Sequence, residues 1–224
     1  MTAILDWTIP NPPTHPGLTP TTPPMYEEGK RLPDPAPRPV PPPAGWREVP
    51  MPPAVAALPR DRRGYPVFYT VQPPGGVPDD GQVDFRVLNL THHIRCAEER
   101  RCGICAGRLP RRLYFIGGPM CVQNRIFGDG PLHEACARYA LQVCPHLHHA
   151  KHQYSATEVP GTRHDPNVIR RKPERIVLYV CQEYSFQPAP GGKPVFLVPP
   201  ALNVEWYTPD GAYVARTRPT RYAQ

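Results

Sequence analysis

Two short stretches decide the fold of this chain: Cys102-Gly-Ile-Cys105 (CGIC) and, after 27 intervening residues, His133-Glu-Ala-Cys136 (HEAC). Two cysteines separated by two residues bend the backbone into a knuckle in which both thiolates face one point, and Gly103 eases that bend. His133 and Cys136 stand three residues apart, which places both side chains on one face of a helix near its first turn. We therefore expect the four side chains to meet in one tetrahedral site.

The donor set of this site predicts the metal that it holds. Three sulfurs and one imidazole nitrogen suit zinc better than calcium or magnesium. Four protein ligands also complete the shell and leave no open position for water, so we expect a structural zinc ion rather than a catalytic one. For either pair alone, a buried cysteine or histidine without a ligand role is a serious alternative, and the presence of both pairs weakens it.

The order of elements around the two pairs resembles a known class of zinc fingers. A knuckle, then a strand or hairpin, then a helix that carries the second pair is the order of the treble-clef class, and the resemblance covers about residues 102–144. That class includes nucleic-acid binders, protein-interaction modules and some nucleases. The resemblance therefore implies a fold more than a function.

The stretch GDGPLHEACARYALQVCP, which begins at Gly128, predicts the helix that carries the second pair. Gly130 or Asp129 can cap its start and Pro131 suits its first turn. Pro145 ends it. Apolar residues at spacings of three and four predict one buried face, made of Leu132, Cys136, Tyr139, Ala140 and Val143.

The rest of the chain from residue 61 predicts short strands. Runs of β-branched and aromatic residues occupy 64–72, 82–90, 112–116, 174–186, 193–198 and 203–216. The first two are expected to form a hairpin, Thr91 is a possible cap for a short helix that leads into the first pair, and PDG at 209–211 predicts a hairpin turn. We expect an α+β domain over 61–224, with the finger at about 96–147 and a β meander at about 174–217.

Residues 1–60 have a different composition. They contain half of the 36 prolines of the chain, and proline removes backbone donors and fixes φ, so neither helix nor sheet is expected to persist there. We predict an extended proline-rich arm. One interpretation is a solvated linker, and the other is a strap that lies on a partner protein through Trp7, Tyr26 and Trp46.

The net charge of +7 invites a nucleic-acid partner. However, only 4 of the 26 basic residues are lysines, and an arginine-rich chain is also what a GC-rich genome encodes without selection for binding. The candidate cationic surface is Arg108, Arg111, Arg112, Arg125, Arg170, Arg171, Lys172 and Arg175. The alternative is that these charges only solvate loops.

Further cysteines and histidines lie outside the predicted site. Cys121 and Cys144 are expected to be small buried side chains, with spare ligands as the alternative, and Cys96 and Cys181 are assigned to packing. The histidine-rich stretch His146–His152, together with His92 and His93, predicts a solvated polar region or, alternatively, a second weak metal site or a pH-sensitive patch.

The sequence gives little support to an enzyme. A treble-clef nuclease of the HNH type needs a histidine that activates water, and no histidine lies between Cys105 and His133. Only Asn124 and Asp129 in that interval could touch a metal-bound phosphate. The deaminase motif, GxSxG, the Walker loop and GxGxxG do not occur either. We expect a binding module without catalytic residues and without a small-molecule substrate.

A longer resemblance supplies context. The stretches RGYPVFYTV, DFRVLNL, RCGICAGRL, GGPMCVQNRIF and PLHEACARYALQVCPHL resemble a family of uncharacterised proteins encoded by bacteriophages and by actinobacterial and other bacterial genomes. The resemblance implies a phage or prophage origin and no mechanism. We expect a module that acts on nucleic acid or on a nucleic-acid-handling protein, with a virion assembly protein as the alternative and a nuclease as a third.

The expected location follows from the same observations. No apolar stretch reaches the roughly 20 residues of a membrane span, and the first residues lack the features of a secretory signal. Cysteines at short spacing in a reducing compartment bind metal more often than they form disulfides. We expect the host cytoplasm, or the virion if the protein is structural.

Overall fold

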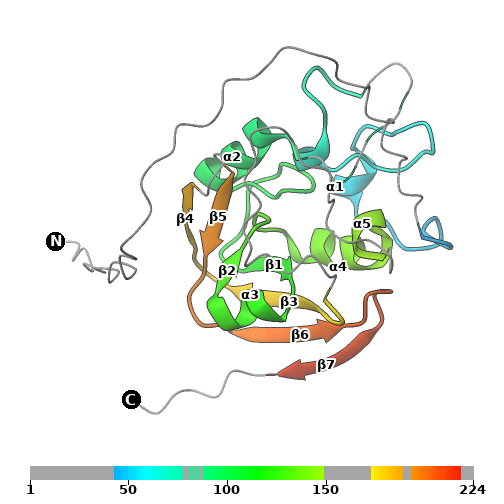
Figure 1. Cartoon of the computed structure of the whole chain (residues 1–224). Helices are drawn as coiled ribbons and strands as arrows, with labels where there is room; N and C mark the ends of the chain where they lie inside the picture. Colours follow the sequence, from blue (N-terminus) through cyan, green and yellow to red (C-terminus); the bar gives the residue numbers. More distant parts are fainter. Residues whose placement is uncertain are drawn as a thin grey trace, which may run out of the picture. The chain divides into compact units, whose positions relative to one another are not determined.

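The computed structural model describes residues 43–77, 81, 83, 85, 88–148, 173–188 and 193–217 of the chain (Figure 1). All of them belong to one compact unit, Pro37–Gln224. Its helices are α1 (Pro53–Ala56), the 3-10 helix η1 (Tyr69–Val71), α2 (Leu90–Glu99), α3 (Pro119–Asn124), α4 (Glu134–Val143) and α5 (Pro145–His148). Its strands are β1 (Leu113–Gly117), β2 (Ile126–Phe127), β3 (Ile176–Cys181), β4 (Ser185–Pro188), β5 (Pro194–Leu197), β6 (Asn203–Tyr207) and β7 (Tyr213–Thr217).

The strands form two antiparallel sheets, which confirms the predicted α+β class. The larger sheet has the order β1-β3-β6-β7, and the smaller has the order β2-β5-β4. Each sheet therefore joins a strand from the finger region, β1 or β2, to strands from the C-terminal third of the chain. The segment 174–217 contains five strands, β3 to β7, which are divided between the two sheets and do not form the single meander that was expected.

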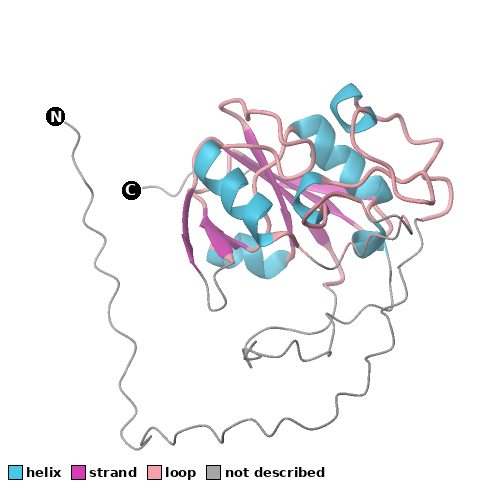
Figure 2. Ribbon diagram, turned by 90° about the horizontal axis from the view of Figure 1, so that it is seen from above, coloured by secondary structure: helices cyan, strands magenta, loops and turns pink. Residues whose placement is uncertain are grey.

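Strand β3 is the centre of the domain. All six of its residues are buried, which explains why IVLYVC is apolar throughout and does not alternate. The side chains of Ile176, Leu178 and Val180 belong to a core cluster shared with α4, and those of Val177, Tyr179 and Cys181 belong to a second cluster shared with β2 and β5. Strand β3 thus packs on both of its faces, and Figure 2 shows the strands of the domain together with the helices that lie beside them.

The predicted helices form, but their starts differ from the sequence prediction. Helix α2 is capped by Asn89, whose side-chain oxygen accepts a hydrogen bond from the His92 amide at 3.2 Å, and not by Thr91. Helix α4 begins at Glu134, so Pro131 lies before it and neither Asp129 nor Gly130 caps it. The reason is a long-range contact, because Leu132 pairs with Tyr114 through two backbone hydrogen bonds and holds this segment extended.

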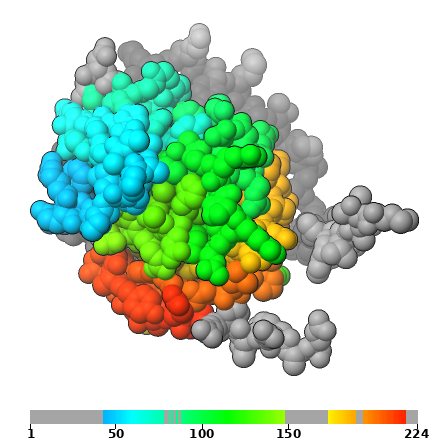
Figure 3. All heavy atoms as spheres, turned by 180° about the vertical axis from the view of Figure 1, so that it is seen from behind, coloured from blue at the N-terminus to red at the C-terminus, as the bar shows by residue number. Residues whose placement is uncertain are grey.

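The described part of the predicted arm, residues 43–60, packs with the domain. Trp46 and Val55 are buried in the same cluster as Tyr65, and the rings of Trp46 and Tyr65 lie 5.0 Å apart. The Tyr65 hydroxyl donates a hydrogen bond to the Val143 carbonyl at 2.5 Å at the end of α4. The space-filling view shows this blue segment against the yellow-green residues of α4 and α5 (Figure 3). Residues 1–42, with Trp7 and Tyr26, lie outside the described residues.

The hairpin predicted for residues 64–90 is wrong in its first strand. The stretch 64–72 forms an isolated bridge from Pro66 to Arg60 and then the turn of η1, with no strand. Its backbone is instead bound to the knuckle, since the Tyr69 amide donates to the Ile104 carbonyl at 2.8 Å and the Thr70 amide to the Gly103 carbonyl at 3.0 Å. Much of the second predicted strand, at 82–90, lies outside the described residues.

Candidate metal centre

The four predicted ligands meet at one point. One ligand atom from each of Cys102, Cys105, His133 and Cys136 lies within 4.8 Å of all the others. Nδ1 of His133 is 3.3 Å from the sulfur of Cys105 and 4.0 Å from that of Cys136. Cys102 and Cys136 are buried, and Cys105 and His133 are half-buried. The described residues therefore contain one Cys3His group that can hold a metal ion.

Backbone hydrogen bonds shape the knuckle that carries the first pair. The Cys102 amide donates to the Gly107 carbonyl and the Ala106 amide donates to the Cys102 carbonyl, both at 2.9 Å. The residue with a left-handed backbone in this turn is Ala106, at φ 59°, and not Gly103. The bend is thus made just after the second cysteine, and the expectation for Gly103 is corrected.

Gly107 leaves space for the site and was not singled out from the sequence. A Cβ atom at this position would lie 3.2 Å from Cε1 of His133 and 3.4 Å from the sulfur of Cys105. Any side chain at Gly107 would therefore press on two ligands at once. The sequence signal for it was only its place two residues after the CGIC motif.

The imidazole of His133 is oriented from both sides. His133 occupies the N-cap position of α4 with extended backbone angles, φ −69° and ψ 153°, so it precedes the helix and only Cys136 lies within its first turn. Its Nε2 is 2.9 Å from the Arg108 carbonyl, to which it can only donate, and Nδ1 faces the sulfurs; in the neutral tautomer that this bond selects, Nδ1 is the nitrogen with a free lone pair. Each of the two ring nitrogens therefore faces a partner: Nε2 the Arg108 carbonyl and Nδ1 the sulfurs.

The amide of Gly103 links the two ligand pairs. It donates to the Pro131 carbonyl at 3.1 Å, two residues before His133. Together with the Leu132–Tyr114 pairing, this bond fixes the knuckle against the chain that enters α4. The observed order is the knuckle, strand β1, helix α3, strand β2 and helix α4, so helix α3 is an addition to the order of knuckle, strand or hairpin, and helix that the treble-clef resemblance implied.

Helix α4 is fixed to the larger sheet by a buried carboxylate. Glu205 on β6 is 1% exposed and accepts hydrogen bonds from Arg138 on α4 at 2.9 and 3.1 Å, from Arg216 on β7 at 2.6 Å and from the Tyr207 hydroxyl at 2.7 Å. Burial raises the pKa of Glu205, but these hydrogen bonds outweigh it and lower the pKa to about 2. The charged form is thus the one that the fold stabilises.

The cysteines of the cluster have unequal proton affinities. Burial opposes the thiolate of Cys102, but hydrogen bonding from Cys105 and Cys136 outweighs it and holds the pKa of Cys102 well below its usual value. The pKa of Cys136 is raised, because its thiol bonds to Cys102 and to Cys105 and is itself buried. Three sulfurs so close together favour one negative charge, and a bound dication would favour thiolates at all of them.

The other cysteines and histidines do not join the cluster. Cys96 and Cys181 are buried, as their assignment to packing expected, whereas Cys121 and Cys144 are half-buried. The described residues contain no second group of three or more metal-ligating side chains, so the alternative of a second metal site finds no support in them. Residues 149–152 of the histidine-rich stretch, and the side chain of His148, lie outside the described part.

The predicted cationic residues are exposed where the structure describes them. Arg108, Arg111, Arg112, Arg125 and Arg175 are all exposed, and the first of them follows the knuckle directly. Within the described residues none of these five arginines forms an ion pair, in contrast to Arg95, Arg101, Arg138 and Arg216. Arg170, Arg171 and Lys172 lie outside the described residues.

No helix among the described residues has the length and apolar character to cross a membrane, and the longest, α2 and α4, have 10 residues each. No protein-family model, curated protein or solved structure matches this chain. The resemblance to a bacteriophage and actinobacterial family therefore stays a prediction.

Proposed function

We propose that this chain is a non-enzymatic binding module that a structural zinc ion stabilises and that acts on nucleic acid. The zinc assignment rests on the donor set, because three thiols and one imidazole nitrogen match the ligands of closed structural zinc sites. When bound, the ion would supply a rigid crosslink between the knuckle and the start of α4. Cys102, Cys105, His133 and Cys136 would hold it.

The contacts of both ring nitrogens of His133 support a structural role for the metal ion. A hydrolytic site needs a histidine nitrogen or an open metal position to activate water. Here Nε2 of His133 is bonded to the Arg108 carbonyl and Nδ1 faces the sulfurs, so neither nitrogen is left for that task. Asp129, one of the two residues considered for a nuclease, pairs with Lys193 at 3.4 Å. This geometry favours a module without catalytic residues.

The observation that carries the nucleic-acid partner is the set of exposed arginines without acidic partners among the described residues. A guanidinium that is already paired has little to gain from a phosphate, whereas a free one releases counterions from the backbone when it binds. Arg108 lies at the metal centre itself, since its carbonyl accepts the bond from His133. Arg111 and Arg112 directly precede β1. Loading of the metal would therefore order the segment that presents them.

The test is a salt titration of DNA binding. The holoprotein is mixed with a fluorescent duplex of about 20 base pairs, and the anisotropy is measured between about 50 and 200 mM salt, over which each phosphate contact contributes a log–log slope of about −0.9. The variant Arg111→Gln/Arg112→Gln should weaken binding uniformly across sequences and reduce the slope by roughly 2.

Arg95→Gln/Arg101→Gln is the matched control, because it removes the same charge from two guanidiniums that are both paired with Glu99. It should leave the slope nearly unchanged. Absent or salt-insensitive binding, or an equal effect of the two double variants, would contradict the nucleic-acid partner. A protein that binds no DNA yet retains zinc would point to a protein partner instead.

A further inference from the structure

A cavity of about 410 Å³ lies beside the metal centre, and the binding module as proposed makes no use of it. A dry apolar cavity of about 150 Å³ already holds one benzene molecule, and small-molecule sites typically have about 300–1,000 Å³. One wall is the knuckle itself, because Gly103 and Ile104, which lie between the two cysteine ligands, line it together with Leu132, the residue before His133. The cavity and the metal centre therefore share a wall.

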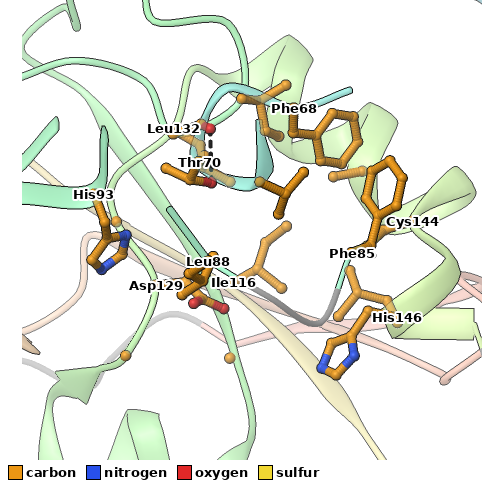
Figure 4. Close-up of a pocket in the computed structure, with 18 of the residues that line it drawn as sticks. Phe68, Thr70, Phe85, Leu88, His93, Ile116, Asp129, Leu132, Cys144 and His146 are labelled. Atoms are coloured by element: carbon orange, nitrogen blue, oxygen red, sulfur yellow. Dashed lines mark hydrogen bonds between the residues drawn. The ribbon is translucent and has the colours of Figure 1, made fainter. Parts of the chain in front are cut away.

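Most of the lining is apolar. The aromatic rings of Phe68 and Phe85, whose centroids lie 5.7 Å apart at 87°, form one side. Figure 4 shows these two rings on the same side of the cavity, with Leu88 and Ile116 near its middle. Other elements complete the apolar surface with Ile104 of the knuckle, Ala140 of α4 and Ile176 of β3. A molecule that fits against this surface gains mainly by burying apolar area.

The hydroxyl and the two charged groups of the wall have partners within the fold. The Thr70 hydroxyl donates a hydrogen bond to the Gly103 carbonyl at 3.0 Å, as Figure 4 shows. The charged side chains, Asp129 and Lys193, pair with each other at 3.4 Å and are 69% and 39% exposed, which places them at the solvent-facing edge of the cavity. A charged ligand would have to compete with this pair and lose its own hydration.

His93, which also lines the cavity, serves the fold and carries no charge. It is 1% exposed, and its ring packs edge-on against Phe196 with the centroids 5.5 Å apart. Burial lowers the pKa of His93, and the opposing effects of Asp129 and of two backbone groups do not cancel it, so the imidazole is neutral at pH 7. Figure 4 shows His93 on the opposite side of the cavity from the two phenylalanine rings. A ligand against those rings therefore meets no charge from this histidine.

We propose that this cavity binds a small, uncharged, apolar molecule, which lies against the rings of Phe68 and Phe85. The volume and the apolar wall carry the proposal. A polar or charged group on the ligand would lose its bonds to water without equal replacements, which costs free energy. Because Ile104 and Leu132 line the cavity and flank metal ligands, a bound molecule would also stabilise the wall shared with the metal centre.

The isoleucine methyl groups report on the cavity directly. Ile104, Ile116 and Ile176 line it, whereas Ile94 and Ile126 do not. The holoprotein is labelled at the δ1 methyl groups of isoleucine, and toluene is titrated into it while the methyl resonances are followed by NMR. Toluene should shift the three methyl groups of the cavity, leave the other two unchanged and bind with a dissociation constant on the order of 1 mM.

Two charged probes of similar size test the preference for an uncharged ligand. Benzoate and benzylammonium carry the same ring as toluene with one negative or one positive charge. Each should bind at least about tenfold more weakly than toluene, because its charge must be desolvated. A thermal measurement is independent of the NMR signal: toluene at about five times its dissociation constant should raise the melting temperature of the holoprotein by about 2–4 °C.

Variants test whether toluene occupies this cavity. Ile116→Phe places a larger side chain near the middle of the cavity and should weaken toluene at least about fivefold. The matched control is Ile126→Phe, the same change at an isoleucine that is 41% exposed and does not line the cavity, and it should keep the affinity within about twofold. Leu88→Phe narrows the cavity from a different segment, so it replaces Ile116→Phe if that variant does not fold.

The outcomes are distinct. No shift of the three cavity methyl groups with toluene up to its solubility limit would overturn the proposal, and so would benzoate or benzylammonium binding as tightly as toluene. Equal toluene affinity of the wild type and the folded cavity variants would do the same. Because no DNA is present, failure here is independent of failure of the nucleic-acid partner.

Discussion

The metal centre and the cavity share a wall, and each contains a histidine: His133 in the metal centre and His93 in the wall of the cavity. The surroundings of the two histidines differ. In the metal centre, His133 uses one nitrogen toward the sulfurs and the other toward the Arg108 carbonyl. In the wall of the cavity, His93 is more deeply buried than His133 and packs edge-on against Phe196. The difference teaches that the same side chain serves the fold in two ways: His133 through directed contacts of both nitrogens, and His93 through burial of its ring.

The largest effect on stability is expected from removing one of the four side chains of the metal centre. Cys102→Ser removes a buried ligand, and because metal binding at such a site is largely folding energy, we expect a loss of roughly 5 kcal/mol or more and a melting temperature lower by about 10–20 °C. Zinc content and thermal unfolding measure it. The control is Cys181→Ala, a buried cysteine on β3 that donates to the Glu183 carbonyl and is not a ligand.

Cys181→Ala should keep the zinc and lose only about 1–2 kcal/mol. If Cys102→Ser retained its zinc and its melting temperature, the cluster would not be a metal site.

A smaller effect is expected where α4 is fixed to the sheet. The pKa of Glu205 is lowered to about 2 from its usual value of 4.5, so its contribution is present above about pH 4.5 and is lost as the pH falls through about 2. The shift corresponds to at most about 3 kcal/mol. Glu205→Gln should lower stability at pH 7 by up to this amount and flatten the acid limb of the stability curve.

Denaturant unfolding of wild type and Glu205→Gln from pH 7 to pH 2 measures this difference. Acid would release a bound zinc ion from both proteins alike, so only the difference between them reports on Glu205. Curves that stay parallel at all pH values would show that the carboxylate contributes nothing through its charge.

The smallest effect sharpens the comparison at two neighbouring histidines. His92→Phe loses the hydrogen bond to the Tyr69 carbonyl while keeping the stacked ring, whose centroid lies 4.1 Å from that of Tyr69, and should cost about 1 kcal/mol. His93→Phe keeps a ring beside Phe196 and removes a buried imidazole whose nitrogens form no hydrogen bond of normal geometry among the described residues, so it should cost less than His92→Phe. Urea unfolding resolves the pair, and equal destabilisation by both variants would argue that His93 is satisfied.

The meeting of Cys102, Cys105, His133 and Cys136 could be predicted from the sequence, because short spacings within each pair encode it. A CxxC and an HxxC constrain the backbone locally, and β3 and the PDG hairpin turn were likewise visible in local patterns. The start of α4 could not be placed, because the pairing of Leu132 with Tyr114 competes with the local capping signals. Long-range contacts of this kind override local propensity.

The remaining features depend on residues far apart in the chain. Arg138 and Glu205 are separated by 67 positions, and nothing in either neighbourhood marks them as partners. His93 looked like part of a histidine-rich polar set, yet the fold buries it beside Phe196. The cavity is formed by residues from Phe68 to Lys193, so no local pattern predicts it.

The most direct test of the central claim is native mass spectrometry of the purified wild-type protein, with Cys102→Ser measured alongside it. The claim predicts one zinc ion on every wild-type chain and none on Cys102→Ser. A wild-type chain without zinc, purified without chelators, would contradict the structural zinc site and the proposed role of His133 as one of its four ligands.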